Sequence, residues 1–400
     1  MTPALALAES GEIAAAARAS APADQHMPQL DGIRCYAAVA VVAHHVFLGR
    51  YLRLGTNGIG VYAVWLFFTL SGFLITGILL RGRDSAAGHP RSVLRAFYAR
   101  RFLRIMPVYY AVLFISAAVG MGRSFRHDFV WHVSYMSNWL MAYHGTWAEF
   151  ASPLWSLGVE EQFYLIWPTI VLFAPRRRLF SIFVTAVLVG VLSRLLLALV
   201  LFNHGSSVTV IAPSTSNLDP LALGALLALH RHSAPMATES RQRWTTRALV
   251  AGAALFAVIE VLTITGRAVQ VLLVGETFAA ALMSVWLVDR AATGFAPSTI
   301  GARLLNARVA RYLGTISYGV YVMHGSVRWL FAQTPLRAAL AQRGELWAAV
   351  LYFLIVLAGT ITIASLSWYA FESPINGLKR YFPYAKREPA APVVAAVVQS

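Results

Sequence analysis

The sequence predicts an all-α polytopic membrane protein with about ten transmembrane helices and cytoplasmic N- and C-termini. Three observations support this fold class. First, 58% of the 400 residues are hydrophobic and only 12% are charged, and the mean hydropathy of +0.61 lies well above that of a globular domain. Second, uncharged stretches such as 59–80 have the length of about 20 residues that crosses a bilayer. Third, arginines gather in the short connections between apolar segments, as membrane topology requires.

Ten apolar segments are the expected spans: 31–49, 60–80, 104–120, 153–174, 179–201, 215–230, 247–265, 268–288, 312–332 and 347–371. If the N-terminus is inside, the cytoplasmic connections 81–104, 175–178, 231–247, 290–311 and 379–387 hold 22 Lys or Arg residues, whereas the opposite connections hold 7. This bias predicts the orientation. The apolar segment 131–143 is too short to cross and is expected to be re-entrant or interfacial.

The chain is expected to form one membrane-embedded domain, residues 30–380, between two cytoplasmic tails. Residues 1–29 are Ala-rich and lack a basic start before an apolar core, which predicts a disordered tail instead of a signal peptide; residues 381–400 form the second tail. Most of the basic residues behind the net charge of +16 lie in the connections between apolar segments. The expected partner is therefore the lipid bilayer and not nucleic acid. The single cysteine, Cys35, excludes a disulfide framework, and no pair of histidines one turn apart with a glutamate suggests a metal.

Polar residues inside the apolar segments are candidate functional groups, because they are costly in a membrane. Arg34 and His45 are 11 residues apart, which returns to nearly the same helix face, about 16 Å further along. His45, Glu160, Asp219 and His324 fall at similar depth in the predicted outer half of the bilayer, on four different helices.

A second group lies at the predicted inner surface, where Arg100, Arg101 and Arg104 follow one another. Guanidinium groups match phosphate geometry, so this cluster suits a phosphorylated ligand. A histidine held by a carboxylate suits general-base chemistry on a hydroxyl. Together, the two groups predict a path from an anionic donor inside to a reaction centre nearer the outer side.

Seven motifs in one order resemble the acyltransferase 3 family of integral membrane O-acyltransferases. They are "LDGIRCYAAVAVVAHH", "LFFTLSGFLIT", "RRFLRIMPVYY", "LWSLGVEEQFYLIWP", "LDPLALGALLA", "LGTISYGVYVMHG" and "SLSWYAFESPI". A series of this length is far more specific than any one motif. The resemblance covers nearly all of residues 29–380.

The resemblance implies transfer of a short acyl group, usually acetyl, from acyl-CoA as co-substrate to a carbohydrate hydroxyl. The implied acceptors are a surface or exopolysaccharide, a lipopolysaccharide or a related glycan, and in some members a macrolide-type metabolite; the implied location is the bacterial inner membrane. His45 corresponds to the catalytic histidine and Arg34 to its motif partner, Arg101 and Arg104 to the donor-binding pair, and Glu160 to the motif glutamate. Asp219, His324 and Ser71 are further candidates for substrate binding.

Departures from the family pattern concern acceptor specificity more than the reaction. Trp65 stands where many members have Asp, Asn217 replaces a common Arg, and Gly158 replaces a Ser. The expected mechanism is direct transfer, in which His45, held by a carboxylate such as Glu160, deprotonates the acceptor. A covalent acyl-histidine, or an acyl-serine at Ser71, is the alternative route.

Each candidate also has a structural interpretation. Arg34 could anchor a helix end at the cytoplasmic surface, and His45 could be a packing residue. The Arg101/Arg104 pair could reflect only the enrichment of arginine in cytoplasmic connections. Glu160 suits an ion pair with Arg194, and His324 and Asp219 suit helix–helix hydrogen bonds. We expect Glu161, Glu260 and Glu276 to be mainly structural. The rival function is a transporter of an acyl group or a sugar lipid, although the sequence lacks the inverted repeat of many transporters.

Overall fold

A computed structural model describes residues 27–49, 58–85, 89–121, 123–148, 150–201, 206–234, 237–265, 269–335 and 346–384. The expected tails therefore lie outside the described residues, apart from 27–29 and 381–384. Residues 28 and 29 belong to the first helix, which therefore begins before the expected first span at residue 31. Within the described residues the fold is entirely helical.

Each expected span coincides with a helix, or with two consecutive helical pieces. These are α2 (Pro28–Ala43) with the π-helical turn η1 (His44–Leu48), α4 (Ile59–Ser85), α5 (Pro90–Val119), α9 (Leu154–Phe173), α10 (Arg176–Leu201), α12 (Leu218–Ser233), α13 (Thr238–Ile264), α14 (Val269–Thr293), α16 (Arg308–Thr315) with α17 (Ser317–Ala332), and α19 (Leu346–Ser367) with the π-helical turn η3 (Trp368–Glu372). Five of the described helices are long and apolar enough to cross a membrane by length and composition. The count of ten spans and the orientation therefore stay predictions.

Shorter helices complete the fold: α6 (Arg123–His127), α7 (Phe129–Val133), α8 (Ser137–His144), α11 (Ser207–Ile211), η2 (Ser214–Asn217), α15 (Ile300–Asn306), α20 (Ser373–Gly377) and η4 (Leu378–Tyr381). Segment 131–143, expected to be re-entrant or interfacial, runs from α7 into α8 and is too short to span. His132 anchors it, because its Nδ1 lies 2.8 Å from Ser137 Oγ and its ring stacks on Phe125. Burial lowers the pKa of the His132 imidazole to about 4, against a weaker opposing effect of the nearby Asp128.

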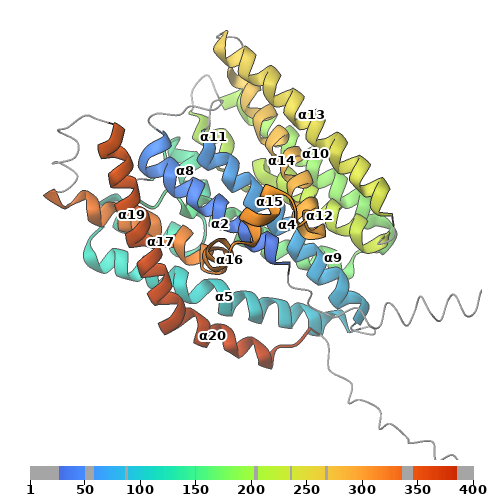
Figure 1. Ribbon diagram of the computed structural model, residues 1–400, viewed down its shortest axis with the longest axis horizontal. Helices are drawn as coiled ribbons and strands as arrows, with labels where there is room; N and C mark the ends of the chain where they lie inside the picture. Colours follow the sequence, from blue (N-terminus) through green and yellow to red (C-terminus); the bar gives the residue numbers. More distant parts are fainter. Residues whose placement is uncertain are drawn as a thin grey trace, which may run out of the picture.

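Helix α4 is central to the assembly and packs against α12, α2, α14 and α9 (Figure 1). Its contact with α12 depends on two glycines, since a Cβ added at Gly72 would overlap the Leu221 carbonyl and one at Gly224 would overlap the Thr69 carbonyl. Small residues at such crossings let helix backbones approach closely in a membrane. Helices α13 and α19 lie on opposite sides of the molecule (Figure 1).

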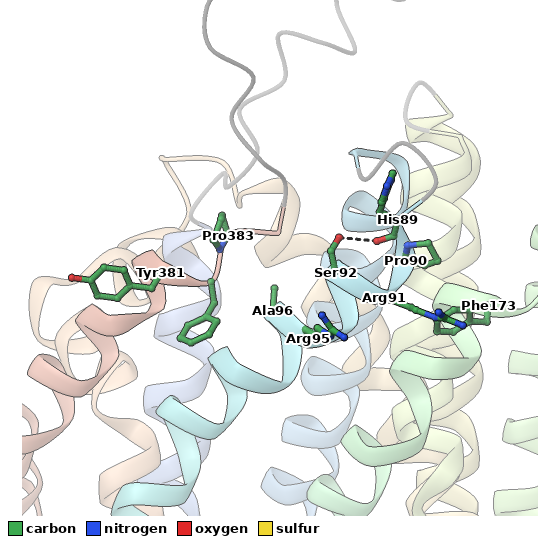
Figure 2. Close-up of a pocket in the computed structure, with 10 residues that line it drawn as sticks. His89, Pro90, Arg91, Ser92, Arg95, Ala96, Phe173, Tyr381 and Pro383 are labelled. Carbon is green, nitrogen blue, oxygen red and sulfur yellow. Dashed lines mark hydrogen bonds between the residues drawn. The ribbon is translucent and has the colours of Figure 1, made fainter.

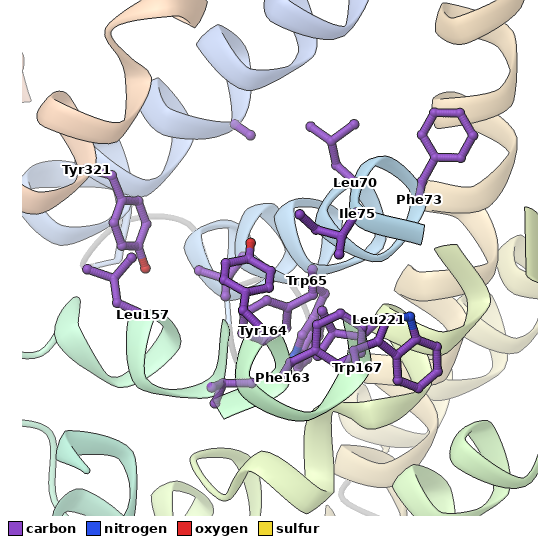
Figure 3. Packing of buried hydrophobic residues seen from close by; sticks show 14 of the residues in the cluster. Trp65, Leu70, Phe73, Ile75, Leu157, Phe163, Tyr164, Trp167, Leu221 and Tyr321 are labelled. Carbon is purple, nitrogen blue, oxygen red and sulfur yellow. The ribbon is translucent and has the colours of Figure 1, made fainter. Parts of the chain in front are cut away.

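Stacked rings hold α9 against α10, and a hydrogen bond joins it to α4. The rings of Phe163 and Trp167 stack 4.7 Å apart, and Trp167 stacks in turn on Phe183 of α10. The Trp167 indole also donates a 2.8 Å hydrogen bond to Thr76 Oγ1 of α4. Figure 3 shows Phe163 and Trp167 in one buried cluster with Trp65, Leu70 and Ile75 of α4 and Leu221 of α12. Glu160 and Tyr164 therefore belong to a helix that contacts both α4 and α10.

Candidate active site

Two histidines predicted to lie at similar depth meet in the structure. His324 Nε2 lies 3.0 Å from His45 Nδ1, and the two rings stack with centroids 5.0 Å apart. His324 is fully buried, whereas His45 is half-buried. His45 is therefore the more exposed residue of the pair.

The hydrogen bonds determine which nitrogen of each neutral ring carries the proton. His324 Nδ1 lies 2.6 Å from the Tyr321 carbonyl oxygen, and a carbonyl can only accept, so this Nδ1 carries a hydrogen. His324 Nε2 is then the acceptor, and His45 Nδ1 must be the donor to it. The lone pair of His45 consequently lies on Nε2, the atom that a general base needs.

Two further contacts hold this pair in place. Arg328 of α17 donates a 2.9 Å hydrogen bond from Nη1 to the His45 carbonyl oxygen. One turn before His324, the Tyr321 hydroxyl lies 2.5 Å from Ser156 Oγ of α9. His45 belongs to the π-helical turn η1, and such turns are rare and often occur at functional sites.

Glu160 does not hold His45, contrary to our expectation. Ser71 of α4 donates a 2.6 Å hydrogen bond to Glu160 Oε1 and receives one of 3.0 Å from the Tyr164 hydroxyl. Arg101 covers the Tyr164 ring at 5.1 Å, and its charge acts on the Glu160 carboxylate. The physical reason is helix packing: the Glu160 face of α9 is turned towards α4 and α5, whereas His45 is turned towards α17.

The arginines expected on the donor side do converge. Arg34 forms a 2.9 Å ion pair with Asp31, one turn before it on α2, and its side chain stays 30% exposed. The positive charges of Arg34 and Arg101 both act on Arg104. Arg104 lies 6.0 Å from the Trp368 ring centroid, and Glu372 nearby provides a partial counter-charge. Three cations from α2 and α5 thus share one region of the fold.

Asp219 serves helix packing instead of facing a ligand. Arg194 of α10 binds both carboxylate oxygens of Asp219, at 2.7 and 2.8 Å, and both residues are fully buried. A Cβ at Gly190 would clash with Asp219, so this glycine permits the close approach of α10 and α12. The contact corrects two predictions: Asp219 is the partner of Arg194 in place of Glu160, and its structural interpretation is favoured over substrate binding.

Sequence reasoning missed Arg328, Tyr321 and Ser156 as supports of the histidine pair. Tyr321 and His324 lie in the same motif at a spacing of three residues, which places them on one helix face. Ser156 similarly precedes Glu160 by one turn. The spacing was therefore visible, but nothing in it indicated that α9 and α17 would meet.

Comparison with known proteins identifies the family. The model of the acyltransferase domain of the acyltransferase 3 family matches residues 27–369. The chain belongs to this family. It is 27% identical over 382 residues to the peptidoglycan O-acetyltransferase OatA of Listeria monocytogenes, covering 90% of this chain and 57% of that protein. It is 30% identical over 377 residues to the putative peptidoglycan O-acetyltransferase YrhL of Bacillus subtilis, covering 88% and 55%.

A third relative, the O-acetyltransferase OatA of Staphylococcus aureus, is 25% identical over 369 residues, covering 88% of this chain and 57% of that protein. This acyltransferase 3 chain therefore spans a little over half the length of these relatives. The comparison with solved structures gave no match.

Proposed function

We propose that this protein is a membrane O-acyltransferase that transfers a short acyl group, acetyl in the simplest case, from acyl-CoA to a carbohydrate hydroxyl. Membership of the acyltransferase 3 family and the O-acetyltransferase names of its relatives support this proposal. The observation that carries it is the pair of His45 and His324, whose hydrogen bonds leave His45 Nε2 as a proton acceptor.

In the proposed reaction, His45 Nε2 removes the proton of the acceptor hydroxyl as its oxygen attacks the thioester carbonyl. The carbon–oxygen bond forms, the carbon–sulfur bond breaks, and the proton held by His45 passes to the leaving sulfur, so the histidine is regenerated. His324 Nε2 accepts a hydrogen bond from the His45 imidazolium and stabilises it, as an orienting partner does in other acyl-transfer sites. His324 thus takes the positioning role that we had assigned to Glu160.

The donor is proposed to bind near Arg34, Arg101 and Arg104, whose guanidinium groups suit its phosphates. Glu160 and Ser71 then lie beside the donor instead of beside the proposed base. The proposed acceptor is a cell-surface glycan, with peptidoglycan favoured by the names of the relatives, and the proposed location is the bacterial inner membrane.

The test is mass analysis of surface glycans from cells that lack the protein or express wild type, His45→Ala or His144→Ala. His144 is exposed on α8 and is the matched control. We expect an acyl increment only with wild type and His144→Ala, because general-base catalysis contributes about 10²- to 10⁴-fold. If His45→Ala, present at a normal level, still gives the increment, the assignment of the base is refuted.

A second pair of variants tests the positioning role of His324. In His324→Gln the amide oxygen can still accept from His45 Nδ1, whereas His324→Leu offers no acceptor. We expect His324→Gln to retain more acyl transfer than His324→Leu at equal protein level. Equal activity of the two variants would contradict a role that depends on this hydrogen bond.

A further inference from the structure

A cavity of about 660 Å³ lies at the N-terminal end of α5, at the predicted inner surface. Figure 2 shows Arg91 and Arg95 of α5 between Phe173 at one end and Tyr381 and Pro383 at the other. The volume lies within the range of small-molecule sites. None of the ten lining residues is acidic.

The two arginines of this cavity have no counter-ion among the described residues. Arg91 and Arg95 form no ion pair or side-chain hydrogen bond within the part of the chain that the structure describes. They point from the first two turns of a 30-residue helix, where the helix dipole adds positive potential. Two arginines at such a place suit a phosphoryl group.

Aromatic rings form the remaining walls. Phe173, Tyr381 and Phe382 line the cavity and are 46%, 63% and 41% exposed. Exposed rings at a membrane surface are often interfacial anchors, but these three flank a pocket that also holds two arginines. An aromatic face next to a phosphate-binding group suits a stacked base.

Helix η4, which forms one wall of the cavity, is hydrogen-bonded to α5 and lies between the cavity and the arginines further along α5. Arg100 Nη1 donates to the carbonyl oxygens of Lys379 and Phe382, at 3.1 and 3.2 Å. The charges of Arg104, Arg101 and Arg100 all act on Lys379. Cations therefore continue from the cavity past Lys379 to Arg104, and Arg95 and Arg104 are separated by about 14 Å of helix rise.

We propose that this cavity binds the 3′-phosphorylated adenine nucleotide of the acyl-CoA donor, with Arg91 and Arg95 on the 3′-phosphate and the aromatic walls against the base. The diphosphate and the thioester arm then extend past Lys379 towards Arg101 and Arg104. This assignment rests on the proposed function, and it places the nucleotide end of the donor in the cavity, with Arg101 and Arg104 further along the donor.

The test compares binding of coenzyme A and dephospho-coenzyme A, which lacks only the 3′-phosphate, to the full-length protein in nanodiscs of zwitterionic lipid. Wild type should prefer coenzyme A by roughly 10- to 100-fold, the size expected of charge-assisted hydrogen bonds. In Arg91→Gln/Arg95→Gln this preference should fall to nearly one, with little change for dephospho-coenzyme A. Arg178→Gln, an exposed arginine outside the cavity, should behave as wild type.

Three outcomes would overturn the inference, and they are distinguishable. If wild type binds neither compound, the proposed donor fails, and this site fails with it. If wild type prefers coenzyme A and the double variant keeps that preference, only the site is wrong. If the double variant instead loses binding of an added anionic phospholipid while its preference for coenzyme A is unchanged, the cavity binds lipid headgroups.

Discussion

The buried ion pair of Arg194 and Asp219 allows a quantitative test of how α10, α12 and α14 are held together. Arg194 donates to both oxygens of Asp219 and also to the backbone carbonyls of Ser216 and Val274. Its side chain is 1% exposed and that of Asp219 is 0% exposed. Arg194→Met therefore leaves a buried carboxylate without its partner. We expect this change to lower the free energy of unfolding by about 3–5 kcal/mol.

The free energy can be measured by denaturing the detergent-solubilised protein with increasing SDS while following tryptophan fluorescence. Arg194→Met/Asp219→Leu should recover much of the loss, because apolar side chains of similar volume replace a buried pair at little cost. Arg243→Met is the matched control: its pair with Glu239 spans 3.7 Å and is 67% and 90% exposed, so it should cost less than about 1 kcal/mol. If Arg194→Met costs no more than Arg243→Met, the pair does not contribute as described.

Three further predictions concern acidity, helix packing and the donor side. The pKa of His132 is about 4 in the fold, against an ordinary 6.5, so the unfolded chain binds a proton first as the pH falls. The free energy of unfolding should therefore decrease between pH 6.5 and 4 by up to about 3 kcal/mol. The variant His132→Phe should lose this pH dependence. Gly224→Leu should reduce the yield of folded protein, because its Cβ would meet the Thr69 carbonyl. Gly377→Ala should not reduce the yield, because there is open space around Gly377. Equal yields of the two variants would contradict the close crossing of α4 and α12. Glu160→Gln should raise the KM for acyl-CoA more than it lowers kcat, because Glu160 lies beside Arg101 and Ser71; a loss confined to kcat in steady-state assays would argue against this placement.

Helix positions and the depth of polar residues could be predicted from the sequence, because both follow from apolar length and a constant rise per residue. This is why His45 and His324, 279 residues apart, were expected at similar depth and do meet. The direction in which each side chain points could not be predicted equally well. It depends on how each helix is rotated against its neighbours, and that rotation is set by tertiary contacts such as the stacked rings of Trp167 of α9 and Phe183 of α10.

Glu160 illustrates that the depth of a residue could be predicted but the direction of its side chain could not. Its depth allowed a contact with His45 or with Arg194, but packing against α4 directs it to Ser71. Asp219 takes Arg194 instead, at a crossing that a glycine makes possible. The convergence of Arg34, Arg101 and Arg104 was easier to expect, because adjacent helix ends at one membrane surface bring their charges together whatever the rotation.

The π-helical turn η1 determines whether residues 44–48 tolerate substitutions or deletions. The Gly49 N–H bonds to the His44 carbonyl, five residues back, so the turn holds one residue more than an α-helical turn does. Losing that residue would restore ordinary helix geometry and rotate His45 by about 100° relative to everything that follows. The constraint on this segment is therefore its length more than its composition. We expect Val46 to be exchangeable for Ile, but its deletion should yield a folded protein whose His45 carbonyl no longer meets Arg328.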